Sequence, residues 1–203
     1  MTSHITYYVS HVSPYNYLGA ARFRKFVEER NLTVEMKIMD LSQVFPKTGG
    51  LPLPQRAPER LAYRLQELRR FSEFYALPLT LQPSVFPPSS GLGALVLAQA
   101  RQQDVGLAMQ VLEVALGMTW ADEKDSGDIA QLTTALNDAG LSGDALIADA
   151  QANQTALQAA VAADSEQAVA DGVFGAPSFK IGDEMFWGQD RLDMLCWYLD
   201  NHA

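Results

Sequence analysis

The sequence predicts an α/β protein with a large all-helical insertion between its second and third strands. Strand patterns occur near both ends of the 203-residue chain, and the long middle section is rich in Ala and Leu at helical spacing. The strand pattern returns only at residue 172. We therefore expect one α/β domain formed by residues 1–42 and 172–203, with residues 43–171 as an inserted helical domain.

A strand–helix–strand unit opens the chain. Residues 5–10 are β-branched and aromatic, which predicts a strand. Residues 14–29 have apolar side chains at helical spacing, and residues 32–40 alternate between apolar and polar side chains. This order predicts two parallel strands joined by a right-handed crossover helix.

The middle section begins with a predicted loop and continues as helices. Residues 45–58 are rich in Pro and Gly, which predicts a long and functional loop, with a plain connector as the alternative. Helical patterns then cover residues 58–75, 92–103, 105–120, 128–137, 142–150 and 153–171.

The last segment returns to strands. Residues 172–188 predict a hairpin whose two short strands are joined by a Gly-Asp turn. Gln189, Asp190 and Arg191 then open a final helix. Cys196 falls on the apolar side of that helix, so we expect a buried core thiol.

Composition excludes several classes of function. A net charge of −9 argues against nucleic-acid binding. The single cysteine cannot form an intramolecular disulfide or a dithiol, and the three histidines are too scattered to predict a metal site. No membrane-spanning run and no signal-peptide pattern are present, so we expect a soluble cytoplasmic protein.

Ser13 and Pro14 mark the start of the first helix. A helix N-terminus offers free N–H donors and the positive end of the helix dipole, and it therefore favours an anion such as a thiolate. Ser13 is thus either a hydroxyl donor to a bound anion or a simple helix cap. His11 precedes this turn, where we expect a surface role, with a proton carrier as the alternative.

Two motifs carry a family resemblance. The first, from Ser13 to Leu18, reads Ser-Pro-Tyr-Asn-Tyr-Leu, and the second runs from Gly172 to Leu192 as Gly-Val-Phe-Gly-Ala-Pro…Phe-Trp-Gly-Gln-Asp-Arg-Leu. Both are similar to those of kappa-class glutathione transferases and 2-hydroxychromene-2-carboxylate isomerases. These families have the thioredoxin-like fold of the disulfide-oxidoreductase A type. Where that fold usually has Cys-x-x-Cys, this chain has Ser13-Pro14-Tyr15-Asn16, which removes dithiol chemistry.

The resemblance implies a glutathione site. Ser13 would be the catalytic hydroxyl that hydrogen-bonds the glutathione sulfur. Pro177 would be a cis proline opposite it, and the backbone of Ala176 would pair with the extended glutathione peptide. Asp190 would hold the γ-glutamyl ammonium group, with Gln189 at the same helix start.

The resemblance also implies a second-substrate pocket between the loop around Gly50 and the inserted helices. Gly50 stands where the families usually have Asn, so the substrate is the least specified part of the prediction. The expected pocket residues are Tyr15, Gly50, Tyr63, Trp187 and Arg191.

The function implied is a glutathione-dependent cis–trans isomerase of aromatic catabolism. Its substrate would be 2-hydroxychromene-2-carboxylate or a related aromatic 2-oxo acid, isomerised by reversible thiolate addition. A kappa-like glutathione transferase or peroxidase, and a non-catalytic thioredoxin-like thiol- or peptide-binding protein, are the alternatives. The resemblance further implies a homodimer.

Overall fold

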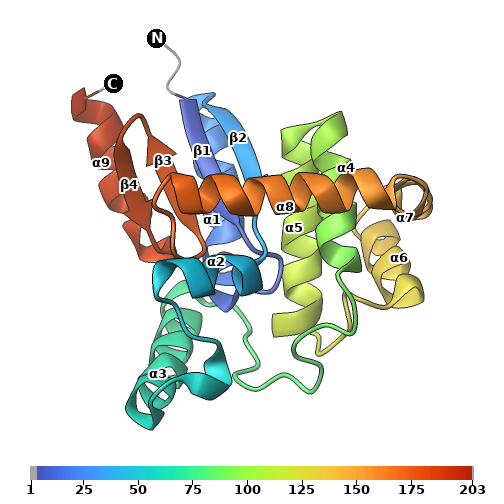
Figure 1. The fold of residues 1–203 in the computed structure, drawn as a ribbon, viewed down its shortest axis with the longest axis horizontal. Coiled ribbons are helices and arrows are strands. Elements are labelled where there is room, and N and C mark those ends of the chain that lie inside the picture. Colours follow the sequence, from blue (N-terminus) through green and yellow to red (C-terminus); the bar gives the residue numbers. More distant parts are fainter. Residues whose placement is uncertain (1–3, 203) are drawn as a thin grey trace.

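A computed structural model describes residues 4–202 and contains a mixed four-stranded sheet (Figure 1). The strands are β1 (His4–Val9), β2 (Thr33–Ile38), β3 (Ser178–Ile181) and β4 (Glu184–Trp187), in the order β2-β1-β3-β4. β1 pairs with β2 in parallel, whereas β3 is antiparallel to both β1 and β4. The predicted crossover unit and C-terminal hairpin are confirmed.

Helices account for most of the rest of the described chain. They are α1 (Pro14–Arg30), α2 (Leu41–Thr48), α3 (Pro58–Tyr75), α4 (Leu92–Gln103), α5 (Val105–Trp120), α6 (Ile129–Asp138), α7 (Gly143–Ala152), α8 (Gln154–Ala170) and α9 (Leu192–His202), with short 3-10 turns η1 (Leu53–Gln55) and η2 (Gln189–Arg191). All helices from α2 to α8 lie between β2 and β3 in sequence, as the predicted insertion requires. The predicted α/β domain was given the bounds 1 and 203, and residues 1–3 and 203 lie outside the described residues.

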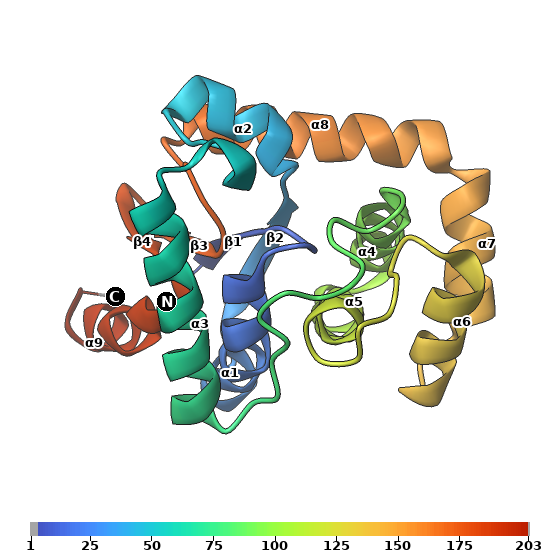
Figure 2. The ribbon, with the colours of Figure 1, turned by 90° about the horizontal axis from the view of Figure 1, so that it is seen from below.

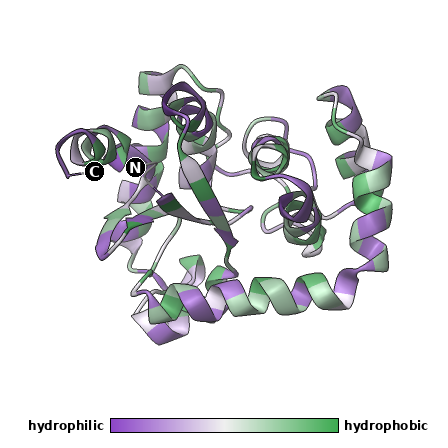
Figure 3. Ribbon diagram, turned by 90° about the horizontal axis from the view of Figure 1, so that it is seen from above, coloured by the Kyte–Doolittle hydropathy of each residue, from purple (hydrophilic) through white to green (hydrophobic). Residues whose placement is uncertain are grey.

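The insertion packs directly against the sheet domain. Figure 2 shows α4 and α5 side by side next to α1 and β2, with α6 and α7 further out. α8 returns along this side and contacts α4, β2 and α2. Apolar and polar residues are mixed along α8 in Figure 3. The sheet domain and the insertion share one hydrophobic core, which includes Tyr7 and Phe23 of the sheet domain and Leu97, Leu112 and Leu157 of the insertion.

The predicted loop over residues 45–58 is partly wrong. α2 extends to Thr48, and its N-cap is Asp40, whose carboxylate accepts a hydrogen bond from the Ser42 N–H at 2.9 Å. Val44 is fully buried in a cluster with Tyr8. The cap and the burial of Val44 offset the backbone hydrogen bond that the helix loses at its internal proline, Pro46. The prediction of a loop gave too much weight to that proline.

The prediction of a buried Cys196 is also wrong. The thiol is only partly buried, and it lies between Arg30 and Asp200 at the surface. Arg30 donates to the sulfur at 2.8 Å and also pairs with Asp200. The side chain therefore faces the charged edge between α1 and α9, because the apolar side of α9 is filled by Leu192, Leu195 and Leu199.

Candidate active site

A β-turn from Ser10 to Ser13 joins β1 to α1 and places the candidate site. The Ser13 N–H donates to the Ser10 carbonyl at 3.1 Å, and Pro14 is the first residue of the helix. The Ser13 hydroxyl accepts the Asn16 N–H at 3.3 Å, so Ser13 caps α1 as the sequence indicated. The exposed fraction of Ser13 is only 5%. The turn thus fixes a serine hydroxyl at a helix N-terminus.

The Ser13 hydroxyl faces the loop before β3. It donates to the Ala176 carbonyl at 3.1 Å, and the Ala176–Pro177 peptide bond is cis. The Pro177 carbonyl in turn accepts the Gly188 N–H at 2.9 Å. This contact brings the start of η2 toward the same loop. Three of the expected residues, Ser13, Ala176 and Pro177, are therefore together.

The Asn16 side chain holds the turn in place through two hydrogen bonds, which the sequence analysis did not predict. Its side-chain carbonyl accepts the Ser10 N–H at 3.0 Å, and its amide donates to the Tyr7 hydroxyl at 3.2 Å. All three residues are buried, and burial raises the pKa of Tyr7 above its usual range. Asn16 occupies the fourth position of the Ser-Pro-Tyr-Asn motif, and its amide suits a structural role because it both donates and accepts.

Gln189 and Asp190 lie at η2, close to α1. Gln189 is 1% exposed, yet neither atom of its amide group has a hydrogen-bond partner among the described residues. A Cβ on Gly19 of α1 would lie 2.6 Å from the Gln189 Cβ, so this contact requires glycine. Asp190 is exposed and lies 3.5 Å from the Arg191 guanidinium. A buried amide without partners is suited to a polar ligand.

Cationic side chains of the insertion lie near Tyr15, two residues after Ser13. Arg64 and Arg56 both act electrostatically on the Tyr15 hydroxyl. Burial lowers the pKa of Arg64, and no carboxylate in the described part of the chain is among the groups that act on it. Arg64 also lies over the Trp120 ring, 5.8 Å from its centroid. Glu67 also acts on Tyr15, so two arginines and one carboxylate lie at this side of the turn, and it is locally positive despite the net charge of −9.

The other expected pocket residues are dispersed. Tyr63 is 57% exposed on α3 and within electrostatic range of Tyr15. Trp187 is half-exposed and packs edge-on against Phe174. Gly50 is covered by the Phe45 ring: a Cβ added at Gly50 would lie 2.5 Å from Phe45 Cδ1. The structure also has a cavity of about 690 Å³. It is lined by none of the five expected pocket residues, Tyr15, Gly50, Tyr63, Trp187 and Arg191.

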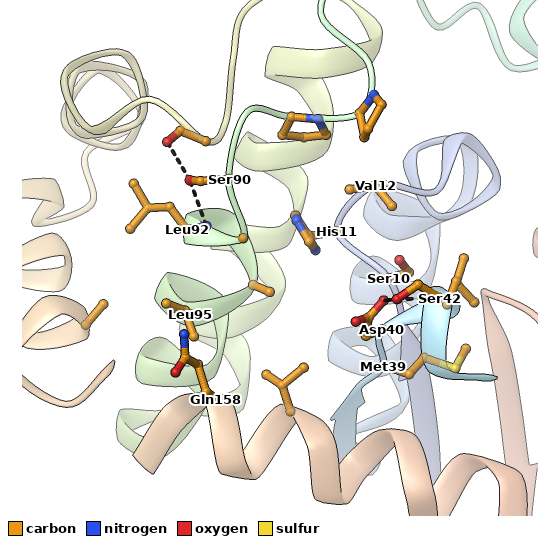
Figure 4. A pocket seen from close by; sticks show the side chains of 18 of the residues that line it. Ser10, His11, Val12, Met39, Asp40, Ser42, Ser90, Leu92, Leu95 and Gln158 are labelled. Atoms are coloured by element: carbon orange, nitrogen blue, oxygen red, sulfur yellow. Dashed lines mark hydrogen bonds between the residues drawn. The ribbon is translucent and has the colours of Figure 1, made fainter. Parts of the chain in front are cut away.

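That cavity, of about 690 Å³, lies on the other side of the turn (Figure 4). Ser10, His11 and Val12 line it, together with the start of α2, the start of α4, the end of α7 and the first half of α8. The expected surface role of His11 is therefore wrong in part: the side chain is half-buried and faces this cavity, because the inserted α4 lies against this face of the turn. Burial lowers the pKa of His11 to about 4, and Asp40 opposes this shift.

The fold and the Ser13 site together define a thioredoxin-type protein without a redox cysteine pair. The model of the DsbA-like thioredoxin domain matches residues 4–200. The chain therefore belongs to the DsbA-like thioredoxin domain family. No helix in residues 4–202 is long and apolar enough to cross a membrane.

Within that family, the curated relatives share one name. The chain is 29% identical over 202 residues to the 2-hydroxychromene-2-carboxylate isomerase of Sphingobium xenophagum, covering 98% of this chain and 99% of the relative. It is 26% identical to the same enzyme of Pseudomonas putida, covering 94% and 91% of the two chains.

Solved structures show the same fold. A 2-hydroxychromene-2-carboxylate isomerase superposes with a TM-score of 0.77 at 24% identity, covering 97% of this chain and 94% of that one. The cytosolic disulfide reductase DsbM of Pseudomonas aeruginosa gives 0.71 at 14% identity, with 97% of each chain covered.

Proposed function

We propose that this protein is a glutathione-dependent cis–trans isomerase of 2-hydroxychromene-2-carboxylate or a related aromatic 2-oxo acid. The observation that carries the proposal is the Ser13 hydroxyl. It lies at the N-terminus of α1 and opposite the Ala176–Pro177 loop, where a disulfide oxidoreductase would have its cysteine. The names of the curated relatives supply the substrate class.

The residues present fit glutathione. Its extended peptide would pair with the Ala176 backbone, and its sulfur would lie by the Ser13 hydroxyl. The amide of Gln189, buried without partners, and the Asp190 carboxylate would take the γ-glutamyl group. Arg56 and Arg64 provide positive charge for a carboxylate. The buried amide and the locally positive side chains are the features that a plain helix cap would not need.

The chain's own residues would stabilise a thiolate. With glutathione bound, the Ser13 hydroxyl would hydrogen-bond the sulfur in place of the Ala176 carbonyl, and the α1 N-terminus would contribute the positive end of its dipole. Lowering a thiol pKa by about two units requires about 3 kcal/mol, which a charge-assisted hydrogen bond plus the dipole can supply. When bound, glutathione would supply a thiolate nucleophile for reversible addition to the conjugated double bond of the ring-opened substrate, so that this bond can rotate before it re-forms.

The test is a spectroscopic assay of chromene-2-carboxylate against hydroxybenzylidenepyruvate, with and without glutathione. We expect interconversion only with glutathione present, and a loss of about a hundredfold in kcat/KM for Ser13→Ala. No turnover with glutathione present would refute this substrate.

An ultraviolet difference titration with glutathione across pH separates the cofactor from the substrate. A thiolate band well below the free thiol's pKa, absent in Ser13→Ala, is expected. Absence of both binding and the band would refute the glutathione site itself.

A further inference from the structure

The β-turn from Ser10 to Ser13 presents different side chains to two sides. Ser13 faces the Ala176 carbonyl, whereas His11 and Val12 line the large cavity. Figure 4 shows the His11 ring between the turn and the start of α4. The cavity therefore adjoins the candidate active site without including its hydroxyl.

The cavity is suited to an uncharged aromatic group. Its volume of about 690 Å³ is within the range of small-molecule sites. Aliphatic side chains such as Leu92, Leu95 and Val161 form much of its wall. Among the described residues that line it, Asp40 is the one charged group, and no lysine or arginine is present. An anionic group would be repelled there, whereas a ring would bury apolar surface.

His11 supplies polar recognition inside this wall. Because its pKa is lowered to about 4, its ring is neutral near pH 7, with one nitrogen donating and the other accepting. The ring forms no hydrogen bond with the residues drawn in Figure 4.

Gly93 allows the His11 ring to approach α4. An added Cβ at Gly93 would lie 2.9 Å from His11 Cδ2 and 3.5 Å from the Ser126 hydroxyl. That hydroxyl is buried and has no partner in the described residues. Gly93 and Ser126 lie behind the residues that line the cavity, so His11 is the group of the two that faces it.

We propose that the cavity binds the hydroxyaryl end of the electrophilic substrate, with the His11 imidazole hydrogen-bonded to its hydroxyl group. The carboxylate of the same molecule stays outside, because the cavity has an acidic residue and no cation. This inference rests on the proposed function, since it takes the substrate class from there. It assigns His11 a role in substrate binding that the glutathione site does not share.

The experiment measures direct binding of hydroxybenzylidenepyruvate in the absence of glutathione, when no turnover is expected. Benzylidenepyruvate, which lacks the hydroxyl group, is the comparison ligand. His11→Phe keeps a ring of similar size but removes both nitrogens. Gln158→Trp places bulk at an exposed cavity-lining position of α8, and Gln102→Trp is the matched control at an exposed position of α4 outside the cavity.

We expect His11→Phe to raise the Kd of the hydroxylated acid about tenfold and to leave that of the other acid unchanged. Gln158→Trp should raise the Kd values of both acids about tenfold or more. Gln102→Trp should leave both Kd values unchanged. Equal losses for both acids in His11→Phe, unchanged Kd values in Gln158→Trp, or no binding to the wild type would each overturn the inference.

The outcomes separate this inference from the proposed function. If the acid binds as expected but glutathione never supports turnover, the cavity assignment stands and the isomerase proposal fails. If turnover occurs and KM is unchanged in both His11→Phe and Gln158→Trp, the isomerase proposal stands and the cavity assignment fails.

Discussion

Ser13 has a structural and a chemical role that substitutions can separate. Its oxygen accepts the Asn16 N–H and its proton is donated to Ala176. Ser13→Ala should lose about 1 kcal/mol of stability with the cap, whereas Ser13→Gly should lose only a few tenths.

Both variants should lose the same catalytic rate, because each lacks the hydroxyl donor. Urea unfolding and the isomerase assay, run on the same preparations, check this. If Ser13→Gly, which loses less stability, also keeps more of the catalytic rate than Ser13→Ala, then Ser13 acts only as a cap.

His11 makes the folded protein sensitive to acid. Its pKa is lowered to about 4, so between about pH 6.5 and 4 the unfolded chain binds a proton there that the folded protein does not. The stability linked to neutral His11 is fully present above pH 6.5 and is lost as the pH falls, up to about 3 kcal/mol. His11→Phe should remove this part of the pH dependence.

Urea unfolding of wild type and His11→Phe at pH 7 and pH 4.5 measures it. The difference in stability between the two proteins should shift in favour of the variant at the lower pH. A difference that is the same at both pH values would contradict a neutral His11 imidazole in the folded protein.

The contact between α1 and η2 controls the position of Gln189 and Asp190. Gly19→Ala would place a Cβ 2.6 Å from the Gln189 Cβ, so η2 must move. We expect a loss of about 1–3 kcal/mol in stability and weaker glutathione binding.

Gly117→Ala is the matched control, because its Cβ on α5 would meet no atom within 4 Å. It should keep the affinity and gain up to about 1 kcal/mol. Calorimetric titration with glutathione and urea unfolding measure both quantities. Equal glutathione affinity in the two variants would place the γ-glutamyl group elsewhere.

Helices with a clear apolar pattern were predicted well from the sequence. α3, α4 and α5 have the predicted bounds, because apolar side chains recur at helical spacing along all three. α2 was missed because Pro46 suggested a loop, whereas Asp40 and the burial of Val44 decide the local structure.

The candidate site was predicted where motifs with a family resemblance cover it, which includes Ser13 in the first motif and Ala176 and Pro177 in the second. Ser13 lies within a motif, so its place at the helix start was readable. The His11 cavity is built from segments near residues 11, 40, 90 and 155, which only the folded chain brings together. No local pattern could have shown that α4 covers His11.

At the scale of the whole molecule, the insertion and the sheet domain should unfold together. They share one hydrophobic core, and Asp164 of α8 also binds the β2 backbone at Ile38 and pairs with Arg101 of α4. Native-state hydrogen exchange should give the slowest amides of β1 and of α5 the same free energy of opening, equal to that of global unfolding. An α5 that opens at a free energy about 2 kcal/mol lower would show an independent helical domain.

The two-sided turn has an evolutionary consequence. Residue 11 contacts the cavity and residue 13 contacts the Ala176 loop, although both belong to one four-residue turn held by Asn16. If the cavity binds the substrate as proposed, a substitution at position 11 changes which molecules enter it while the serine stays in place. New substrate preferences would then arise by single mutations, without an inactive intermediate.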